Sequence, residues 1–181
     1  MKKIGIAGIG GIGSNVAAQL IRSGVMELIY GDFDMVDKSN LNRQFYFWDQ
    51  IGKSKVESLR ENLMKICPTG IYNYQLIKFN KENIPYFFRN CDVIIEGFDS
   101  KLHKRTLVDS LLPLGKIIVS ASGIGGFSCE NVKVRKMTKN FYVVGDFISD
   151  VEKEPTYSHK VMMVASLMTE IAMKEGDYFA K

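Results

Sequence analysis

A run of glycines near the start of the chain has the spacing of a phosphate-binding turn. Gly8, Gly10, Gly11 and Gly13 form the pattern GxGxxG, directly after an apolar stretch and before residues with helical spacing. Glycines let the backbone turn tightly, and the following helix presents unpaired N–H groups and its positive dipole end to a phosphate. Asp32 lies about 20 residues later, where a carboxylate can accept hydrogen bonds from a ribose. These residues predict a nucleotide site.

The polar segment that follows favours a ligand with more charge than a dinucleotide. Residues Asp32–Gln44 read DFDMVDKSNLNRQ, and Gly52–Glu57 read GKSKVE. A dehydrogenase has no general use for these basic and amide groups, whereas a triphosphate does. Arg43 can hold phosphate oxygens with its planar fork, and a lysine supplies a point charge. We expect Lys55 in the first turns of a helix, pointing into the nucleotide crevice.

Alternating strand and helix patterns must position these groups. Apolar strands are predicted at 2–8, 28–32, 71–77, 91–96 and 116–120, and helices at about 16–23, 53–66, 81–88 and 101–112. Gly24 has the place of a helix-ending glycine. The run CDVIIE at 91–96 is apolar on both faces, as parallel strands are. The pattern predicts a Rossmann-like α/β fold, with a mostly parallel sheet and helices on both faces.

The last third of the chain has a different pattern. Residues 131–136 and 140–144 alternate like a hairpin, the polar segment 146–158 predicts a mobile loop, and 159–174 predict a final helix. Its methionines are expected to fill the core: Met162, Met163, Met168 and Met173. We expect a single domain over 1–181, with a core at 2–121 and a C-terminal antiparallel extension at 122–181.

Composition excludes several classes of protein. The chain has 181 residues, of which 46% are hydrophobic and 24% charged, enough for one packed domain. The net charge of +4 is too mild to indicate nucleic-acid binding but suits an acidic ligand. Cys67, Cys91 and Cys129 contain no CxxC pair, which excludes a disulfide framework and a four-cysteine zinc site within one chain. No membrane span or signal peptide is predicted, and a cytoplasmic location is expected.

These motifs together carry a resemblance to a known family. Residues 3–145 resemble the ThiF, MoeB and HesA adenylyltransferases, relatives of the ubiquitin-activating enzymes. The matching motifs are GxGGxGS at Gly8–Ser14, DxDxVxxSNLNRQ at Asp32–Gln44, GKxKxE at Gly52–Glu57, and Asp99 after an apolar strand. The stretches Ala121–Gly123 and Tyr142–Asp146 are most similar to the compact ThiF branch without zinc.

The resemblance implies an activity and its partners. Enzymes of this family use ATP and Mg²⁺ to activate a small sulfur-carrier or ubiquitin-like protein that ends in Gly-Gly. The carrier's carboxylate attacks the α-phosphate and gives an acyl-adenylate and pyrophosphate. For this chain the resemblance implies a ThiS-like carrier, with thiamine biosynthesis as the expected pathway, a homodimer and no structural zinc. A terminal carboxylate is ionised near neutral pH, so positioning and charge neutralisation are expected to supply the catalysis.

The resemblance also implies a role for each matching residue. The backbone near Gly11 approaches the phosphates, Asp32 holds the ribose and Asp99 binds magnesium. The nucleotide-binding set implied is Gly8, Gly10, Gly11, Gly13, Asp32, Asn40, Arg43, Gln44 and Lys55, and the catalytic set is Arg43, Lys55 and Asp99. An alternative for Asp99 is an N-cap on the next helix. Asp34 and Asp37 are expected to make turn and solvent contacts, and Lys53 to be solvated.

Some features depart from the family pattern and leave alternatives open. Many members carry an arginine on a helix before the first strand; this chain starts at the strand, so we expect that arginine to be absent or supplied otherwise. Ser100 and Lys104 stand where asparagine and arginine are usual. Cys129 is the one candidate for sulfur chemistry, although an inert role is favoured because no His or Lys adjoins it. Two other functions stay open: an NAD-dependent oxidoreductase, and a non-catalytic binding subunit.

Overall fold

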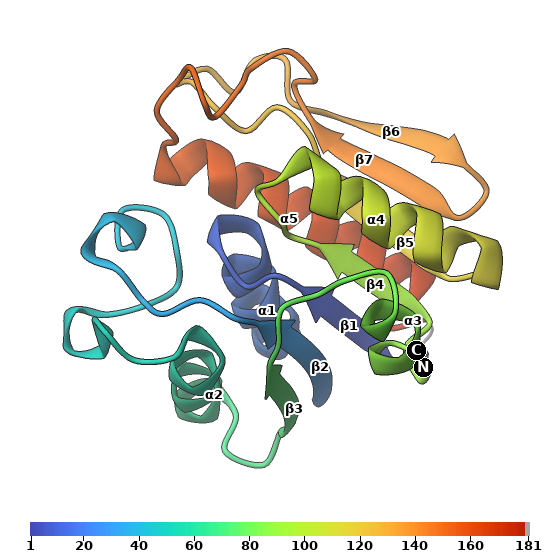
Figure 1. The fold of residues 1–181 in the computed structure, drawn as a ribbon, viewed down its shortest axis with the longest axis horizontal. Helices are drawn as coiled ribbons and strands as arrows, with labels where there is room; N and C mark the ends of the chain where they lie inside the picture. The colour runs from blue at the N-terminus through green and yellow to red at the C-terminus, as the bar shows by residue number, and fades with distance from the viewer. Residues whose placement is uncertain (180–181) are drawn as a thin grey trace.

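The computed structural model describes residues 1–179 and has a seven-stranded sheet between two layers of helices (Figure 1). The strand order is β3-β2-β1-β4-β5-β7-β6, and neighbouring strands are parallel except β6 and β7. The strands are β1 (Ile4–Ala7), β2 (Glu27–Asp32), β3 (Ile71–Leu76), β4 (Val93–Glu96), β5 (Ile117–Ala121), β6 (Lys133–Thr138) and β7 (Phe141–Gly145). The α-helices are α1 (Gly11–Arg22), α2 (Lys55–Ile66), α3 (Asn83–Phe87), α4 (Lys101–Leu111) and α5 (Ser158–Glu175). Short 3₁₀ helices lie at η1 (Lys38–Asn40), η2 (Trp48–Gln50) and η3 (Leu112–Leu114). The predicted Rossmann-like fold is confirmed.

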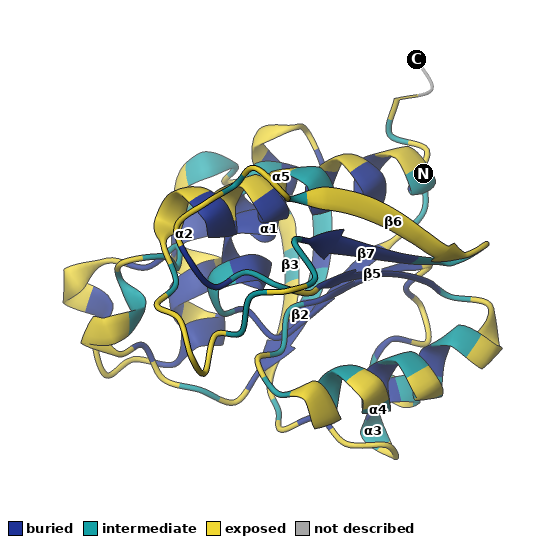
Figure 2. Ribbon diagram, turned by 90° about the horizontal axis from the view of Figure 1, so that it is seen from above, coloured by how far each residue is buried: buried dark blue, intermediate teal, exposed yellow. Residues whose placement is uncertain are grey.

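Each face of the sheet has its own buried cluster. Figure 2 shows α1, α2 and α5 on one face and α3 and α4 on the other. Side chains of β4 alternate between the two clusters: Val93 and Ile95 pack with the first set of helices, and Ile94 packs with the second. This is why 91–96 read as apolar on both faces. No helix within residues 1–179 has the length and apolar character that crossing a membrane requires.

Most element boundaries lie within two residues of the prediction. The largest difference is at α1, which begins at Gly11 and not at about residue 16. The helix predicted from residue 53 begins at Lys55, because Gly52 takes a left-handed φ of +81° and Ser54 bridges to Met35. Helix α1 ends at Arg22, and Gly24 follows with a φ of +91°, as its helix-ending position predicted.

The C-terminal residues form the predicted hairpin and final helix, but they continue the main sheet. Strand β7 pairs in parallel with β5, so the hairpin extends the sheet that holds the nucleotide motif. Met168 and Met173 are buried, as expected. The prediction was wrong for Met162 and Met163, which are 46% and 44% exposed because they lie on the outer side of α5.

Candidate active site

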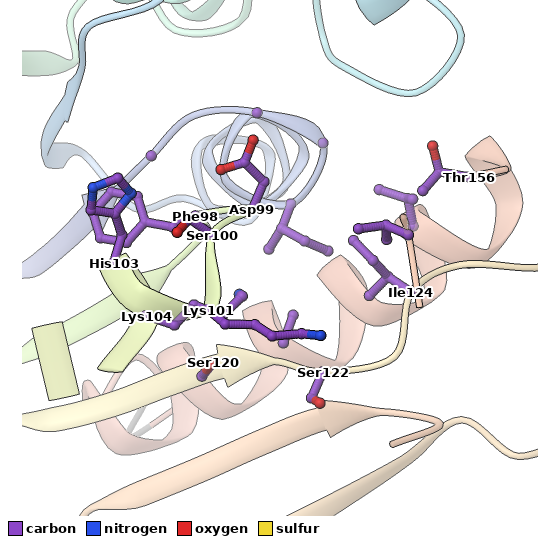
Figure 3. A pocket seen from close by; sticks show the side chains of 18 of the residues that line it. Phe98, Asp99, Ser100, Lys101, His103, Lys104, Ser120, Ser122, Ile124 and Thr156 are labelled. Carbon is purple, nitrogen blue, oxygen red and sulfur yellow. The ribbon is translucent and has the colours of Figure 1, made fainter. Parts of the chain in front are cut away.

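A cavity of about 760 Å³ lies at the carboxyl ends of β1, β2, β4 and β5 (Figure 3). Residues at or just beyond the ends of these strands line it, among them Gly8, Asp32, Gly97 and Ser122. The chain runs outward from β1 to β2 and β3, then returns to β4 on the other side of β1. Such a reversal of strand order leaves a crevice where open α/β sheets bind ligands. The fold therefore brings the sequence motifs to one binding cavity.

The glycine turn presents an uncapped helix end to this cavity. Gly8, Gly10 and Gly11 line the cavity, and Gly8 has a left-handed φ of +79°. Gly10 is the N-cap of α1, no side chain caps it, and the first turn of α1 contains no acidic residue. Unpaired N–H groups at a helix N-terminus form a site for an anion. The turn thus suits a phosphate, as the sequence predicted.

Gly13 has a structural role instead of the expected contact with the nucleotide. It does not line the cavity, and a Cβ atom at this position would lie 2.0 Å from the carbonyl oxygen of Gly8. Only glycine therefore lets α1 pack so closely against the end of β1. Gly13 fixes the direction in which the helix N-terminus points.

Asp32 is at the end of β2 and orders the turn around it. Its Oδ2 accepts a hydrogen bond from the backbone N–H of Ile9 at 2.8 Å, and its Oδ1 accepts one from Asp34 at 2.9 Å. Burial raises the pKa of Asp32, while these two N–H groups and the charge of Lys55 oppose the rise. Each oxygen keeps a second lone pair for a ribose hydroxyl, and Asp32 lines the cavity.

Arg43 and Gln44 reach the cavity from the segment between η1 and η2. The Nη1 atom of Arg43 donates to the carbonyl oxygen of Ser39 at 3.0 Å and to Oδ1 of Asn42 at 2.8 Å. Gln44 has a buried Oε1 atom without a hydrogen-bond partner among residues 1–179. A buried amide oxygen that stays unpaired is costly. A polar ligand that donates to Gln44 would remove this cost.

Asn40 is not where the resemblance implied. Its side chain does not line the cavity; Oδ1 accepts a hydrogen bond from the backbone N–H of Asp37 at 3.1 Å, within a capping box on η1. Its carbonyl oxygen accepts from the N–H groups of Arg43 at 3.1 Å and Gln44 at 2.9 Å. Asn40 therefore builds the turn that holds Arg43 and Gln44. Asp37 makes the turn contacts that were expected.

Lys55 is held by an acidic partner at the cavity wall. It begins α2, is 4% exposed and lines the cavity. Its Nζ atom lies 2.8 Å from Oδ2 of Asp34, whose side chain is 46% exposed. The expectation of only turn and solvent contacts for Asp34 was therefore incomplete. Lys53, by contrast, is exposed, as predicted. The pair holds a buried cation at the wall of the cavity that the glycine turn also lines.

Asp99 is an exposed carboxylate that lines the cavity, just beyond β4. Figure 3 shows its side chain in the cavity. The N-cap of α4 is Ser100, so the capping alternative for Asp99 is wrong. Within residues 1–179 the Asp99 side chain makes no hydrogen bond, and no cluster of three metal-ligating side chains occurs. Its oxygens are therefore available to a ligand.

A buried carboxylate behind Asp99 was missed in the sequence. Glu96 is fully buried at the end of β4, and its Oε2 accepts hydrogen bonds from Lys104 Nζ at 2.8 Å and Ser120 Oγ at 2.5 Å. Its Oε1 accepts from the N–H of Phe98 at 2.7 Å. Lys104 stands where the family usually has an arginine, and here it forms the ion pair that neutralises Glu96. A carboxylate closing the apolar run CDVIIE was the signal that could have revealed it.

The cysteines and histidines differ in burial and in their position relative to the cavity. Burial raises the pKa of Cys91 to about 12, so this thiol is protonated at neutral pH. Cys67 and Cys129 are half-buried, and neither lines the cavity. His103 is on α4 at the cavity edge. His159 is exposed at the start of α5.

The aromatic residues after Gln44 differ in burial. Tyr46 is buried, and its hydroxyl donates to the carbonyl oxygen of Ile9 at 2.8 Å, which ties the segment to the glycine turn. Tyr46 therefore packs this part of the segment against the fold. Phe47 and Trp48 are 47% and 66% exposed. The homodimer that the family resemblance implies stays a prediction.

Comparisons with known proteins agree with the motifs. The ThiF family matches residues 1–174. The chain belongs to the ThiF family. It is 33% identical over 124 residues to the adenylyltransferase and sulfurtransferase UBA4 of Candida glabrata, covering 68% of this chain and 29% of that protein. It is 34% identical over 113 residues to the ubiquitin-like modifier-activating enzyme 5 of Caenorhabditis elegans, covering 62% and 25%.

A solved structure supports the ThiF-family fold over nearly the whole chain. The Escherichia coli tRNA N6-threonylcarbamoyladenosine dehydratase, TcdA, in complex with ATP, superposes with a TM-score of 0.90 at 19% identity. The match covers 99% of this chain and 87% of that one. This chain spans less than a third of the two sequence relatives. Family and fold are therefore established.

Proposed function

We propose that this protein is an ATP-dependent adenylyltransferase. Its substrate would be the carboxyl-terminal Gly-Gly of a small ThiS-like sulfur carrier, and thiamine biosynthesis would be its pathway. The observation that carries the proposal is the convergence, in one cavity of a ThiF-family chain, of an uncapped helix end, two cations and a free carboxylate. The cations are Arg43 and Lys55, and the carboxylate is Asp99.

In this proposal, the two substrates occupy opposite ends of the cavity. The nucleotide binds at the β1–β2 end, where Asp32 accepts from the ribose and the N–H groups of α1 face phosphate oxygens. Arg43 and Lys55 neutralise the triphosphate. The carrier's carboxylate approaches from the β5–β7 end, past Asp99. Both substrates are thereby held with the reacting atoms side by side, which lowers the entropic part of the barrier.

The chemistry needs no side-chain base. The carrier's carboxylate is ionised near neutral pH, and one of its oxygens forms a bond to the α-phosphorus. The bond from that phosphorus to the bridging oxygen breaks, and pyrophosphate leaves with the electron pair. Carboxylate and triphosphate repel each other, so Arg43 and Lys55 contribute by cancelling negative charge in a site that is partly closed to water.

Asp99 fits a magnesium ion that binds together with the nucleotide. Mg²⁺ is usually held by about one or two carboxylates plus substrate phosphates, so a lone free carboxylate beside a phosphate site is a suitable donor set. When bound, the ion would neutralise phosphate charge and polarise the phosphoryl group. Asp99 would hold it, with the remaining ligands from phosphate and water.

Two alternatives have less support. An NAD-dependent oxidoreductase rests on GxGxxG and Asp32 alone, whereas the relatives named above carry adenylyltransferase or activating-enzyme names. A non-catalytic subunit is disfavoured because Arg43, Lys55 and Asp99 all line the cavity. The cytoplasmic location, the homodimer and the absence of zinc stay predictions from the sequence.

Pyrophosphate exchange tests the proposal. Purified protein with ATP, Mg²⁺ and a ThiS-like carrier is expected to transfer label from radioactive pyrophosphate into ATP. The same carrier lacking its two terminal glycines is expected to give no exchange, because the nucleophile is then out of reach. A panel of Gly-Gly carriers from thiamine, molybdopterin and cysteine pathways identifies the partner by rate. Absence of exchange with every carrier would disprove the enzyme assignment.

A further inference from the structure

Lys160 is a buried cation that lies outside the set of residues proposed above. It is in the first turn of α5 and is 2% exposed. Its Nζ atom donates hydrogen bonds to the carbonyl oxygen of Gly125 and, at 2.6 Å, to Oδ2 of Asp146. A buried ammonium group is costly unless it is paired and hydrogen-bonded. Its two partners come from two different loops, which suggests that the pair joins them.

Asp146 continues this connection into the second loop. Its Oδ1 accepts hydrogen bonds from the N–H groups of Ile148 and Ser149, both at 2.9 Å, and from Ser149 Oγ at 3.0 Å. Partial burial tends to raise the pKa of Asp146, but Lys160 and these donors outweigh it and lower the pKa to about 2. Asp146 is therefore ionised at neutral pH, and Lys160 is one of the groups that stabilise its charge.

The two loops form one wall of the cavity, here called the distal wall and defined as residues 122–124 and 147–151. Backbone hydrogen bonds join them: Phe147 N–H donates to Ser122 at 3.2 Å, and Asp146 N–H donates to Gly123 at 3.1 Å. A Cβ atom on Gly123 would lie 2.0 Å from Asp146 Oδ1, so the loops are packed closely around this carboxylate.

The distal wall is at the opposite end of the cavity from the nucleotide end. The wall follows β5 and β7, whereas the nucleotide end follows β1 and β2, on the other side of β4 in the strand order. Figure 3 shows Ser122 and Ile124 apart from Phe98 and His103, which come after β4 in the chain. The wall combines backbone groups with apolar side chains, including Ile124, Phe147 and Ile148. Such a lining suits an extended peptide segment better than a phosphate. Lys160 itself does not line the cavity, so it cannot touch the peptide directly.

We propose that Lys160 and Asp146 are positioning residues that hold the distal wall in the shape that receives the carboxyl-terminal peptide of the carrier. The inference rests on the proposed function for the identity of that peptide. The physical claim about the wall stands by itself: removing the buried cation should loosen both loops. The nucleotide end, built from β1, β2, α2 and the N-terminus of α1, should be unaffected.

The order of the wall can be measured without substrate. Hydrogen–deuterium exchange is compared between the wild-type protein, Lys160→Met and the control Lys174→Met, which removes an exposed lysine from the same helix. The amides of Phe147, Ile148 and Ser149 are expected to exchange about tenfold or more faster in Lys160→Met only. Unchanged protection of these amides in Lys160→Met would overturn the positioning role.

Enzyme kinetics then distinguish an effect on carrier binding from an effect on ATP binding. With a ThiS-like carrier in the exchange assay, Lys160→Met is expected to raise the KM for the carrier by about tenfold or more, while the KM for ATP changes by less than about threefold. Equal losses for both substrates would indicate general damage and contradict the proposal, as would unchanged carrier kinetics. Lys174→Met should behave like the wild-type protein.

A second variant keeps the test decisive if Lys160→Met does not fold. Asp146→Asn removes the charge but retains an oxygen that can accept from Ile148 and Ser149. Asp146→Asn is expected to speed the exchange of the same amides and to raise the KM for the carrier. Both effects should be smaller than in Lys160→Met. Loss of ATP affinity in Asp146→Asn would contradict the inference. If the wild-type protein exchanges with no carrier, the proposed function and the peptide assignment both fail, and amide exchange alone decides the positioning role.

Discussion

Replacing Asp99 by alanine is expected to lower kcat for pyrophosphate exchange by about 10²–10³-fold while leaving the fold intact. The carboxylate is exposed and makes no hydrogen bond within residues 1–179, so its removal costs the fold little. In the proposed site it holds the ion that neutralises the phosphates. The residual activity of Asp99→Ala should therefore require more Mg²⁺ for half-maximal rate. Circular dichroism checks the fold, and a Mg²⁺ titration of the rate checks the role.

Asp109 offers a matched control for this prediction. It is also an exposed aspartate, in α4, and it pairs with Arg105 at 3.4 Å. Asp109→Ala should retain the wild-type rate and Mg²⁺ dependence, because Asp109 does not line the cavity. A wild-type Mg²⁺ dependence in Asp99→Ala would remove Asp99 from the metal site.

Replacing Lys55 by methionine is expected to lower kcat/KM for ATP by about 30- to 10³-fold, which corresponds to about 2–4 kcal/mol. Lys55 is nearly fully buried, and it carries its charge at the edge of the glycine turn. Methionine keeps the length of the side chain but cannot neutralise phosphate. Initial rates at varied ATP concentration measure the effect. Arg43→Ala should give a loss of the same kind.

Two companion variants identify the cause of that loss. Lys53→Met removes an exposed lysine two positions earlier and should leave the rate unchanged. Lys55→Met combined with Asp34→Asn removes both members of the ion pair, so no unpaired carboxylate is left behind. The double variant is expected to stay as impaired as Lys55→Met. Recovery of the rate in the double variant would mean that Lys55 serves only to neutralise Asp34.

Local patterns in the sequence were sufficient to predict the fold. The GxGxxG turn, the apolar run at 91–96 and the hairpin at 131–144 each reflect interactions between residues near one another in the chain. The position of Lys55 in the first turn of α2, at the cavity, followed from the same local logic. The pairing of β7 with β5 could not be predicted in this way, because pairing of distant strands leaves no short-range signal in the sequence.

Side-chain partners were harder to predict where two roles compete for one residue. Asn40 stands in the motif beside Arg43, yet its amide is used inside the η1 turn, where capping is geometrically favoured. Asp34 was expected to face solvent, although Lys55 lies 21 positions later and comes within 2.8 Å. A sequence motif shows which residues are near a site, but not which of them contact the ligand.

Lys160 was missed for a related reason. It is in a helix whose apolar stripe was interpreted as core, and its partner Asp146 lies 14 positions earlier, across an irregular loop. That loop was predicted to be mobile because of its polar composition. Its hydrogen bonds to Asp146 give it a defined conformation. The signal available in the sequence was a single lysine near the start of an apolar helix. Only the structure shows that this lysine is buried, and its role depends on that burial.

The central claim is that this cavity binds a nucleoside triphosphate. Calorimetric titration of the folded protein with ATP and Mg²⁺ tests it most directly, with NADH titrated in parallel. The account predicts saturable ATP binding with a Kd of about 1 μM to 1 mM, weakened in Lys55→Met, and no heat from NADH. Saturable binding of NADH together with no detectable binding of ATP would contradict it.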